Sequence, residues 1–179
     1  MRKLFLVFIA MMISGGCASL NITETRDEQL QTAYDNLMEK QAVKETITLL
    51  FISTDNRDWH KVKDLFAPEV RFDMTSLAGG EPVTLKPGDI VDAWDKGLKP
   101  IKAIHHQAGN FLITFDDGGA TAFCYGIASH YLPNKTHMNT RTFVGSYDFH
   151  LVRINGKWKI DQFKFNLKYL DGNLNLESS

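Results

Sequence analysis

The second half of the chain constrains the fold most, because four strand-like segments follow one another there. These segments cover residues 101–115, 120–132, 142–154 and 157–169. Two of the junctions between them, Asp-Asp-Gly-Gly at 116–119 and Asn-Gly at 155–156, are sequences typical of β-hairpin turns. Consecutive strands joined by such short turns pair antiparallel. We therefore expect a meandering sheet in this half of the chain.

Helix-like segments precede these strands. Apolar residues recur at helical spacing after a capping-box sequence at Thr25, which predicts a first helix to about Ser53 with a break near residues 39–41. Further expected elements are helices at 58–66 and 90–98, a strand at 70–74 and a loop at 76–86. Helices followed by antiparallel strands indicate an α+β fold, with the helices packed on one face of the sheet.

The N-terminus has the layout of a secretory signal. A cationic start is followed by ten apolar residues at 4–13, which are too few to span a bilayer, and then by small residues. The sequence Ile-Ser-Gly-Gly-Cys at 13–17 resembles a bacterial lipobox. That resemblance implies secretion across the inner membrane and a lipid anchor on Cys17 in the cell envelope. The alternative is ordinary secretion without a lipid on Cys17.

The rest of the chain is expected to form one domain. Of the 179 residues, 44% are apolar and 23% are charged, a balance typical of globular proteins. A formal net charge of -1 makes nucleic acid a poor partner. We expect a signal peptide at 1–16, a polar tether at 17–26, the domain at 27–170 and a C-terminal tail at 171–179.

Metal ligation is the first chemistry to consider in a chain with six histidines. The sequence has no His-Glu-x-x-His motif and no Cys pair at zinc spacing. His105 and His106 are adjacent on an expected strand, so they point to opposite faces. Cys124 lies in an apolar strand-like segment and is expected to be a small buried residue. We expect no metal and no cofactor.

A histidine–carboxylate pair is the stronger candidate for chemistry. Asp55 lies at the turn after the first helix, and one of His105 and His106 must face inward from a central strand. A neutral imidazole there can act as a base near pH 7, and a neighbouring carboxylate would fix its tautomer. The alternative is that Asp55 caps the 58–66 helix.

Several segments resemble the SnoaL-like domains of the nuclear-transport-factor-2-like superfamily. They are residues 54–59, residues 65–73, the His-x-x-x-Asn spacing of His106 and Asn110, and residues 142–160. The similarity covers about residues 27–170. It implies a cone-shaped barrel in which three N-terminal helices pack in a strongly curved antiparallel sheet around a pocket.

The same resemblance implies roles for individual residues. Asp55 and His106 match the carboxylate and the base of the dyad found in the dehydratase and dehydrochlorinase branches, and His130 lies near a second dehydratase histidine. The expected pocket-lining residues are Asn110, Tyr125, His130, Tyr147 and His150. The alternative for Asn110 is a strand residue at a bulge, and for the others an ordinary half-buried position in the sheet.

The function implied is that of a cofactor-free lyase or isomerase, dehydratase-like, which uses the His106–Asp55 dyad to remove a proton from a small, mainly apolar substrate. Thr54 and Met74 replace tyrosines that polarise the substrate in scytalone dehydratase, so scytalone is not the expected substrate. The alternatives are a non-catalytic, envelope-tethered protein that binds a hydrophobic ligand or a protein partner, and a subunit of a larger oxygenase. The superfamily also implies a homodimer that pairs through the sheet.

Overall fold

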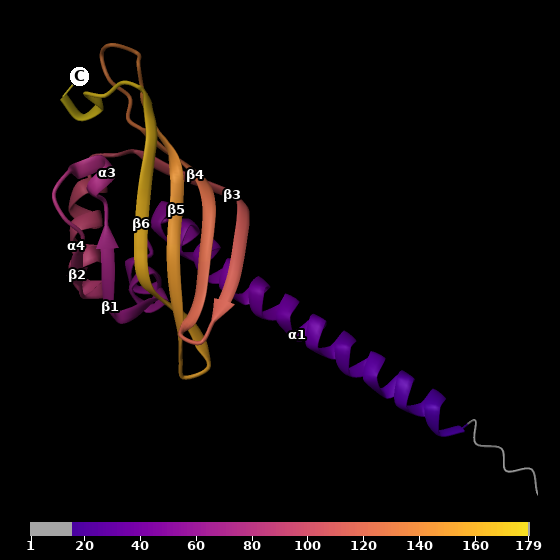
Figure 1. The fold of residues 1–179 in the computed structure, drawn as a ribbon. Helices are drawn as coiled ribbons and strands as arrows, with labels where there is room; N and C mark the ends of the chain where they lie inside the picture. The colour runs from indigo at the N-terminus through magenta and orange to yellow at the C-terminus, as the bar shows by residue number, and fades with distance from the viewer. Residues whose placement is uncertain (1–15, 179) are drawn as a thin grey trace, which may run out of the picture. The chain divides into compact units, whose positions relative to one another are not determined.

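The computed structural model describes residues 16–178, with side chains from residue 25 onward (Figure 1). The helices are α1 (Gly16–Asp55), α2 (Trp59–Leu65), α3 (Thr75–Ala78), α4 (Pro87–Leu98) and the 3-10 helix η1 (Leu176–Ser178). The strands are β1 (Phe66–Asp73), β2 (Val83–Leu85), β3 (Ala103–Asp116), β4 (Gly119–Tyr131), β5 (Thr140–Ile154) and β6 (Lys157–Gly172). The residues up to Met38 form one unit, and those from Glu39 form a second, which contains the whole sheet.

Helix α1 is longer than the sequence indicated. It begins at Gly16 rather than at Thr25, and it continues without a break through residues 39–41. Residues 17–26, the expected tether, contain neither glycine nor proline, so nothing in this segment interrupts the helix. From Glu39 onward, α1 buries one face at helical spacing. Its members are Val43, Ile47, Leu50 and Phe51.

The expected signal peptide lies outside the described residues except for Gly16, and so does the side chain of Cys17. Within the described part of the chain, no helix combines the length and apolar character needed to cross a bilayer.

The sheet is an open, mixed sheet of six strands in the order β2-β1-β6-β5-β4-β3. Strands β3 to β6 form the expected antiparallel meander. The expected α+β fold, with helices packed on the sheet, is confirmed. One detail differs, because strand β1 pairs parallel with β6 and β2 and β3 remain at the two edges, so the sheet is mixed and not closed. The geometric reason is that β1 enters beside the last strand of the meander rather than as a continuation of a hairpin.

Two short elements were not expected. Residues 76–86 were predicted to be a loop, but they contain most of α3 and the edge strand β2, which pairs with β1. Strand β1 begins at Phe66 and passes through Pro68. Its pairing with β6 is irregular between Phe66 and Arg71, which accommodates a residue that cannot donate a ladder hydrogen bond.

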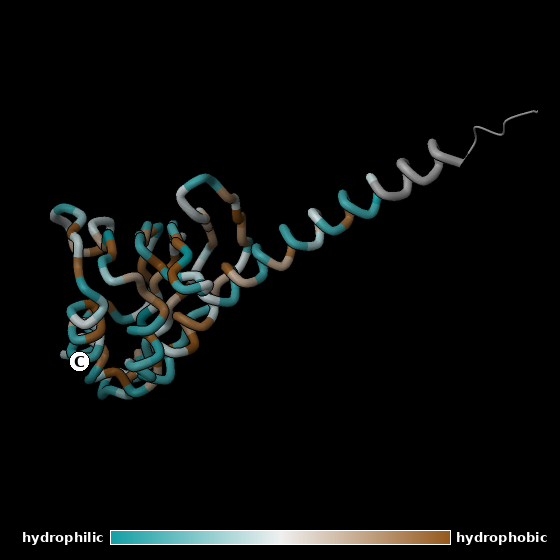
Figure 2. The backbone as a smooth tube through the Cα atoms, turned by 90° about the horizontal axis from the view of Figure 1, so that it is seen from below, coloured by the Kyte–Doolittle hydropathy of each residue, from teal (hydrophilic) through white to brown (hydrophobic). Residues whose placement is uncertain are grey.

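The hydrophobic core lies between the helices and the sheet. On β4, the residues that face this core are small. The buried positions of β4 alternate along the strand, and they are Ala120, Ala122, Cys124, Gly126 and Ala128. Figure 2 colours the backbone by residue hydropathy and shows hydrophobic and hydrophilic positions interspersed along it. Cys124 is buried as expected, and burial raises the pKa of its thiol to about 12. These small side chains leave space for the aromatic rings of the neighbouring strands.

The C-terminal segment is not a loose tail. Strand β6 continues to Gly172, and Leu176 in η1 is fully buried against Ile101 and Ile104. The prediction of a tail at 171–179 is therefore wrong for the residues up to Ser178. The burial of Leu176 fixes this turn against the start of β3.

Candidate active site

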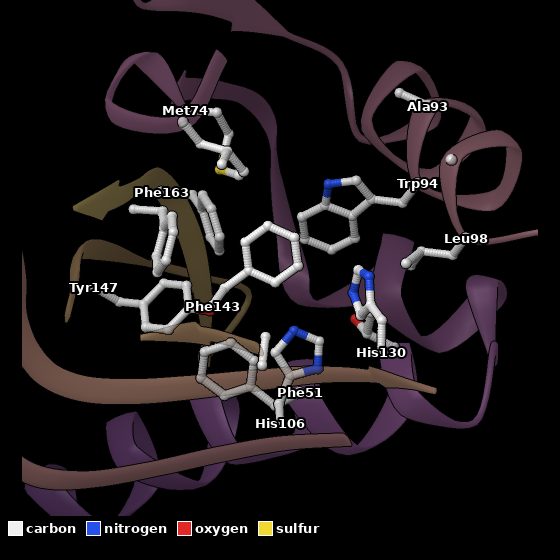
Figure 3. Close-up of a pocket in the computed structure, with 15 residues that line it drawn as sticks. Phe51, Met74, Ala93, Trp94, Leu98, His106, His130, Phe143, Tyr147 and Phe163 are labelled. Atoms are coloured by element: carbon white, nitrogen blue, oxygen red, sulfur yellow. The ribbon is translucent and has the colours of Figure 1, made fainter. Parts of the chain in front are cut away.

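A mainly aromatic cavity of about 260 Å³ lies between the helices and the sheet (Figure 3). Its aromatic residues are Phe51, Trp94, Phe143, Tyr147, Phe163 and Phe165. Two histidines also line it, His106 from β3 and His130 from β4. Among the described lining residues there is no lysine, arginine, aspartate or glutamate. The cavity therefore suits an uncharged, largely apolar molecule that meets two imidazoles.

His106 is bound to Asp55 through both its side chain and its backbone. Its Nδ1 lies 2.6 Å from Asp55 Oδ1, and its backbone N–H donates to Asp55 Oδ2 over 2.9 Å. The side chains of the two residues are 14% and 17% exposed, so solvent screens this pair only weakly. The ring of Phe51 stacks on the imidazole at 5.2 Å. The carboxylate favours the tautomer with a proton on Nδ1, which leaves the Nε2 lone pair available to a ligand.

The interpretation of Asp55 as a helix cap is wrong. The N-cap of α2 is Asp58, whose Oδ1 accepts from the backbone N–H of Lys61 at 3.2 Å. Asp55 is instead the last residue of α1, where its carboxylate reaches across to β3.

The turn after Asp55 connects α1 to the start of β3. Arg57 adopts a left-handed backbone conformation, with φ of 54°, that reverses the chain toward α2. Its guanidinium donates to the carbonyl oxygens of Ile101 at 2.5 Å and Leu98 at 3.3 Å. This clamp holds the end of α1 beside the connection from α4 to β3, which places Asp55 next to His106.

His105 provides a natural comparison with His106. Its side chain is 75% exposed, and its Nδ1 lies 4.0 Å from Asp55 Oδ2. It does not line the cavity. The two adjacent histidines thus point to opposite faces of β3, as the sequence predicts, and only His106 joins the cavity to Asp55.

His130 lies in the same cavity but in a different electrostatic environment. Burial, together with the positive charge of Arg141 and the neighbouring His106, lowers the pKa of His130 to about 4. Arg141 Nη2 lies 3.4 Å from His130 Nδ1. The cavity therefore contains a second imidazole that is uncharged at neutral pH.

Tyr147 contributes a polar group to an otherwise aromatic wall. Its ring is 5% exposed and packs against Phe51, Phe149, Phe163 and Phe165. Burial raises the pKa of its phenol, so the hydroxyl stays protonated and can donate to a ligand. Both His130 and Tyr147 are thus placed at the cavity, as expected.

Three expected lining residues lie elsewhere. Tyr125 and His150 alternate with buried neighbours on β4 and β5 and therefore face the other side of the sheet, Tyr125 beneath Lys168 and His150 bonded to Asp161. Asn110 has φ of 58° and sits at an irregularity in the β3–β4 pairing, as its alternative interpretation proposed. Strand alternation and the bulge explain why none of the three lines the cavity of His106.

Two residues next to the cavity were missed by sequence analysis. Arg141 and Glu177 form a bidentate ion pair behind His130, across 36 residues of sequence. No local motif marks either residue. Among the described residues, no group of three or more potential ligands is arranged to hold a metal ion.

Comparisons with known proteins identify the family and the fold of the chain. Residues 35–164 match the family of SnoaL-like domains. Protein Kfla4162 from Kribbella flavida is 21% identical with a TM-score of 0.75, over 80% of this chain and 99% of that one. No match is found among curated proteins.

Two further structural neighbours are named for elimination chemistry. A candidate scytalone dehydratase from Novosphingobium aromaticivorans is 16% identical with a TM-score of 0.67, over 77% of this chain and 89% of that one. The hexachlorocyclohexane dehydrochlorinase LinA-type3 from Novosphingobium barchaimii is 14% identical with a TM-score of 0.66, over 79% of this chain and 94% of that one. At these identities the likeness shows the fold alone.

Proposed function

Because this chain belongs to the family of SnoaL-like domains, we propose that it is a cofactor-free lyase or isomerase in which His106 and Asp55 act as a base dyad. The observation that carries the proposal is the 2.6 Å contact between His106 Nδ1 and Asp55 Oδ1 at the wall of an apolar cavity. His106 Nε2 would take a proton from carbon, and Asp55 would stabilise the imidazolium that results.

The surroundings of the dyad support this chemistry. Aromatic side chains form much of the cavity lining, so the dyad lies beside a surface of low polarity where electrostatic effects are strong. The lining carries no charged side chain of its own among the described residues, which favours an uncharged substrate. Structural neighbours named as a dehydratase and a dehydrochlorinase suggest that the reaction is an elimination.

A Kemp elimination tests the proposal without knowledge of the natural substrate. In 5-nitrobenzisoxazole, His106 Nε2 would remove the proton from the ring carbon next to nitrogen. The electrons of that C–H bond form the nitrile, the N–O bond breaks, and the oxygen leaves as a coloured phenolate. General-base catalysis typically contributes about 10²–10⁴-fold, so His106→Gln should lose an acceleration of this size.

His105→Gln is the matched control. It removes the neighbouring imidazole, which lies 4.0 Å from Asp55 but outside the cavity, and should leave the rate unchanged. Equal rates for the wild-type protein and His106→Gln would contradict the proposal. If the probe still bound in that case, the cavity would instead belong to a protein that holds a hydrophobic ligand, which is the alternative function.

The outer face of the sheet is proposed to pair two copies of the chain. Large apolar side chains are exposed there on β3 and β4, and they are Leu112, Tyr125 and Ile127. Exposed apolar groups gathered on one face commonly mark interaction sites. This pairing leaves the cavity, on the other face, open to a ligand in both copies.

The envelope location is also a proposal, and it rests on the sequence at 13–17. Lipidation at Cys17 would anchor the domain to a membrane through its N-terminus. Labelling of the expressed full chain with radioactive palmitate tests this directly. The label is expected in the wild-type protein and should be absent from Cys17→Ser. Equal labelling of both proteins, or of neither, would contradict the anchor.

A further inference from the structure

The guanidinium of Arg141 lies between His130 and the C-terminal turn. Nη1 and Nη2 donate to the two carboxylate oxygens of Glu177 at 2.9 and 2.5 Å, and Nη2 also lies 3.4 Å from His130 Nδ1. Arginine has donors and no acceptor, so in this contact His130 Nδ1 must accept. A neutral imidazole that accepts at Nδ1 carries its proton on Nε2.

The arrangement is held from several sides. Leu176 is fully buried and fixes the turn that carries Glu177. The guanidinium of Arg141 also lies 5.3 Å from the ring centre of Phe143, which itself lines the cavity. Arg141 Nε is buried and has no hydrogen-bond partner in the described part of the chain. An unpaired buried N–H group lowers the stability of the fold, and an apolar residue at this position would not have this effect.

We propose that Arg141, anchored by Glu177, is a positioning residue that fixes the tautomer of His130, so that Nε2–H serves as an uncharged hydrogen-bond donor to the ligand. The charged and titratable groups that face His130 are Arg141 on β5, Glu177 on η1, His106 on β3 and Asp55 on α1. Arg141 opposes the protonation of His130, and Glu177 limits the net charge that Arg141 adds beside the cavity.

This inference rests on the proposed function and narrows its substrate class. The cavity then offers an acceptor nitrogen on His106 and a donor nitrogen on His130. Both imidazoles extend into the same space in Figure 3. The matching ligand is an uncharged compound whose acidic C–H group lies near a hydrogen-bond-accepting oxygen. In an elimination, that oxygen is the carbonyl or the leaving group that gains negative charge, and the donor stabilises it.

Nitrogen NMR of the ¹⁵N-histidine-labelled full chain tests the proposal, with His130→Gln used to assign the His130 signals. The two tautomers give distinct long-range proton–nitrogen patterns. The wild-type protein is expected to show His130 as the Nε2–H tautomer, with no titration between about pH 5 and about pH 8. In Arg141→Met, both tautomers should be populated and the pKa of His130 should rise, because the nearby positive charge is gone.

Arg153→Met is the matched control. Arg153 also pairs with a glutamate, Glu39, and also lies over an aromatic ring, that of Trp158, but it is not among the groups that act on His130. It should leave the His130 signals unchanged. Arg141→Gln is the milder second variant if Arg141→Met loses its native amide spectrum, since loss of the charge alone must raise the pKa of His130.

Two results would overturn the proposal. One is an Nδ1–H tautomer of His130 in the wild-type protein. The other is a His130 titration that is the same in the wild-type protein and in a folded Arg141 variant. Neither readout depends on turnover, so the proposal can fail while His106 still catalyses the Kemp elimination. If that activity is absent, the proposed function fails even where the tautomer of His130 is as expected.

Discussion

At the residue scale, two histidines share one cavity but are held in different ways. His106 faces a carboxylate from the end of α1, whereas His130 faces a guanidinium from β5. A carboxylate accepts a hydrogen bond from the ring it contacts, whereas a guanidinium donates one to the ring. The same residue type therefore presents an acceptor from β3 and a donor from β4, which is the division of roles that an elimination requires.

Asp55→Asn should lower the Kemp rate by about 100-fold. The asparagine amide can donate to His106 Nδ1, which places the imidazole proton on Nε2 and removes the base from the cavity. Steady-state kinetics with 5-nitrobenzisoxazole measure the effect, and the loss is expected in kcat with KM little changed. A loss confined to KM would show that Asp55 shapes the cavity rather than orienting the base.

The stability of the fold should fall as His130 is forced to accept a proton. Its pKa is about 4 in the folded protein, against an ordinary value of 6.5, so the unfolded chain binds more protons between these values. Stability therefore rises with pH across this window, by up to about 3 kcal/mol. Denaturant titrations of the wild-type protein at about pH 7 and about pH 4.5 measure the change.

His130→Gln controls for other groups in this experiment. Glu39, Asp73 and Glu177 have lowered pKa values in the fold because of their hydrogen bonds, so their contributions are lost mainly below about pH 4.5. The variant should lose most of the pH dependence between about pH 6.5 and about pH 4.5. An unchanged slope would show that His130 is not held uncharged by the fold.

At the scale of single elements, β4 determines the size of the cavity. From Ala120 to Ala128 its inner face carries only small residues, and a Cβ atom at Gly126 would lie 2.2 Å from Tyr147 Cε2. No L side chain fits there unless the tyrosine ring moves, and the rings around Tyr147 restrict that movement. The small side chains along β4 thus leave space for the aromatic residues of β5.

Gly126→Ala should destabilise the protein by about 1–3 kcal/mol, the range found for overpacked cores. Chemical denaturation at pH 7 measures the change. Gly97→Ala on α4 is the control, because a Cβ there meets no atom within 4 Å, and an alanine in a helix should stabilise by about 0.5–1 kcal/mol. Equal stability of Gly126→Ala and the wild-type protein would mean that Tyr147 is not tightly held.

The order of the main elements and the approximate bounds of the strands in the meander could be predicted from the sequence, because periodicity and turn residues are local signals. The four strands of the meander, the helix predicted at 90–98 and the opposite orientation of His105 and His106 belong to this class. The parallel pairing of β1 with β6 and the contact of Arg141 with Glu177 could not be predicted. They depend on segments far apart in the chain that no local pattern connects.

The same distinction between local signals and long-range contacts applies to the candidate site residues. Local signals pair Asp55 with one of His105 and His106, but they also allow Asp55 to cap a helix. The resemblance to SnoaL-like domains favours the pair and selects His106. Tyr125 and His130 lie at positions of opposite parity on β4, so one of them had to face outward. The sequence alone does not show whether the even-numbered or the odd-numbered residues of β4 face the cavity. The small even-numbered residues of β4 are buried, so the even-numbered side faces the cavity.

At the scale of the whole molecule, the two faces of the open sheet present different groups of residues. The inner face and the helices enclose the cavity, and the outer face exposes Leu112, Tyr125 and Ile127. A closed barrel would have no edge strands, whereas here β2 and β3 end the sheet. Catalysis and self-association can therefore occupy opposite sides of one layer.

Ile127→Asp should convert a dimer into a monomer, because a charge at the centre of an apolar contact must be desolvated. Size-exclusion chromatography with light scattering gives the mass of the wild-type protein and of the variant. Val83→Asp on edge strand β2 is the control, since it adds the same charge at another exposed apolar position. A wild-type protein that is monomeric at high micromolar concentration would contradict pairing through the outer face.

The central claim is that Asp55 turns His106 into a base whose unprotonated Nε2 meets the ligand. Long-range proton–nitrogen NMR of the ¹⁵N-histidine-labelled protein identifies which ring nitrogen carries the proton. The account predicts the Nδ1–H tautomer for His106 at neutral pH, and loss of that tautomer in Asp55→Asn. An Nε2–H tautomer of His106 in the wild-type protein would contradict it, because no lone pair would then face the cavity.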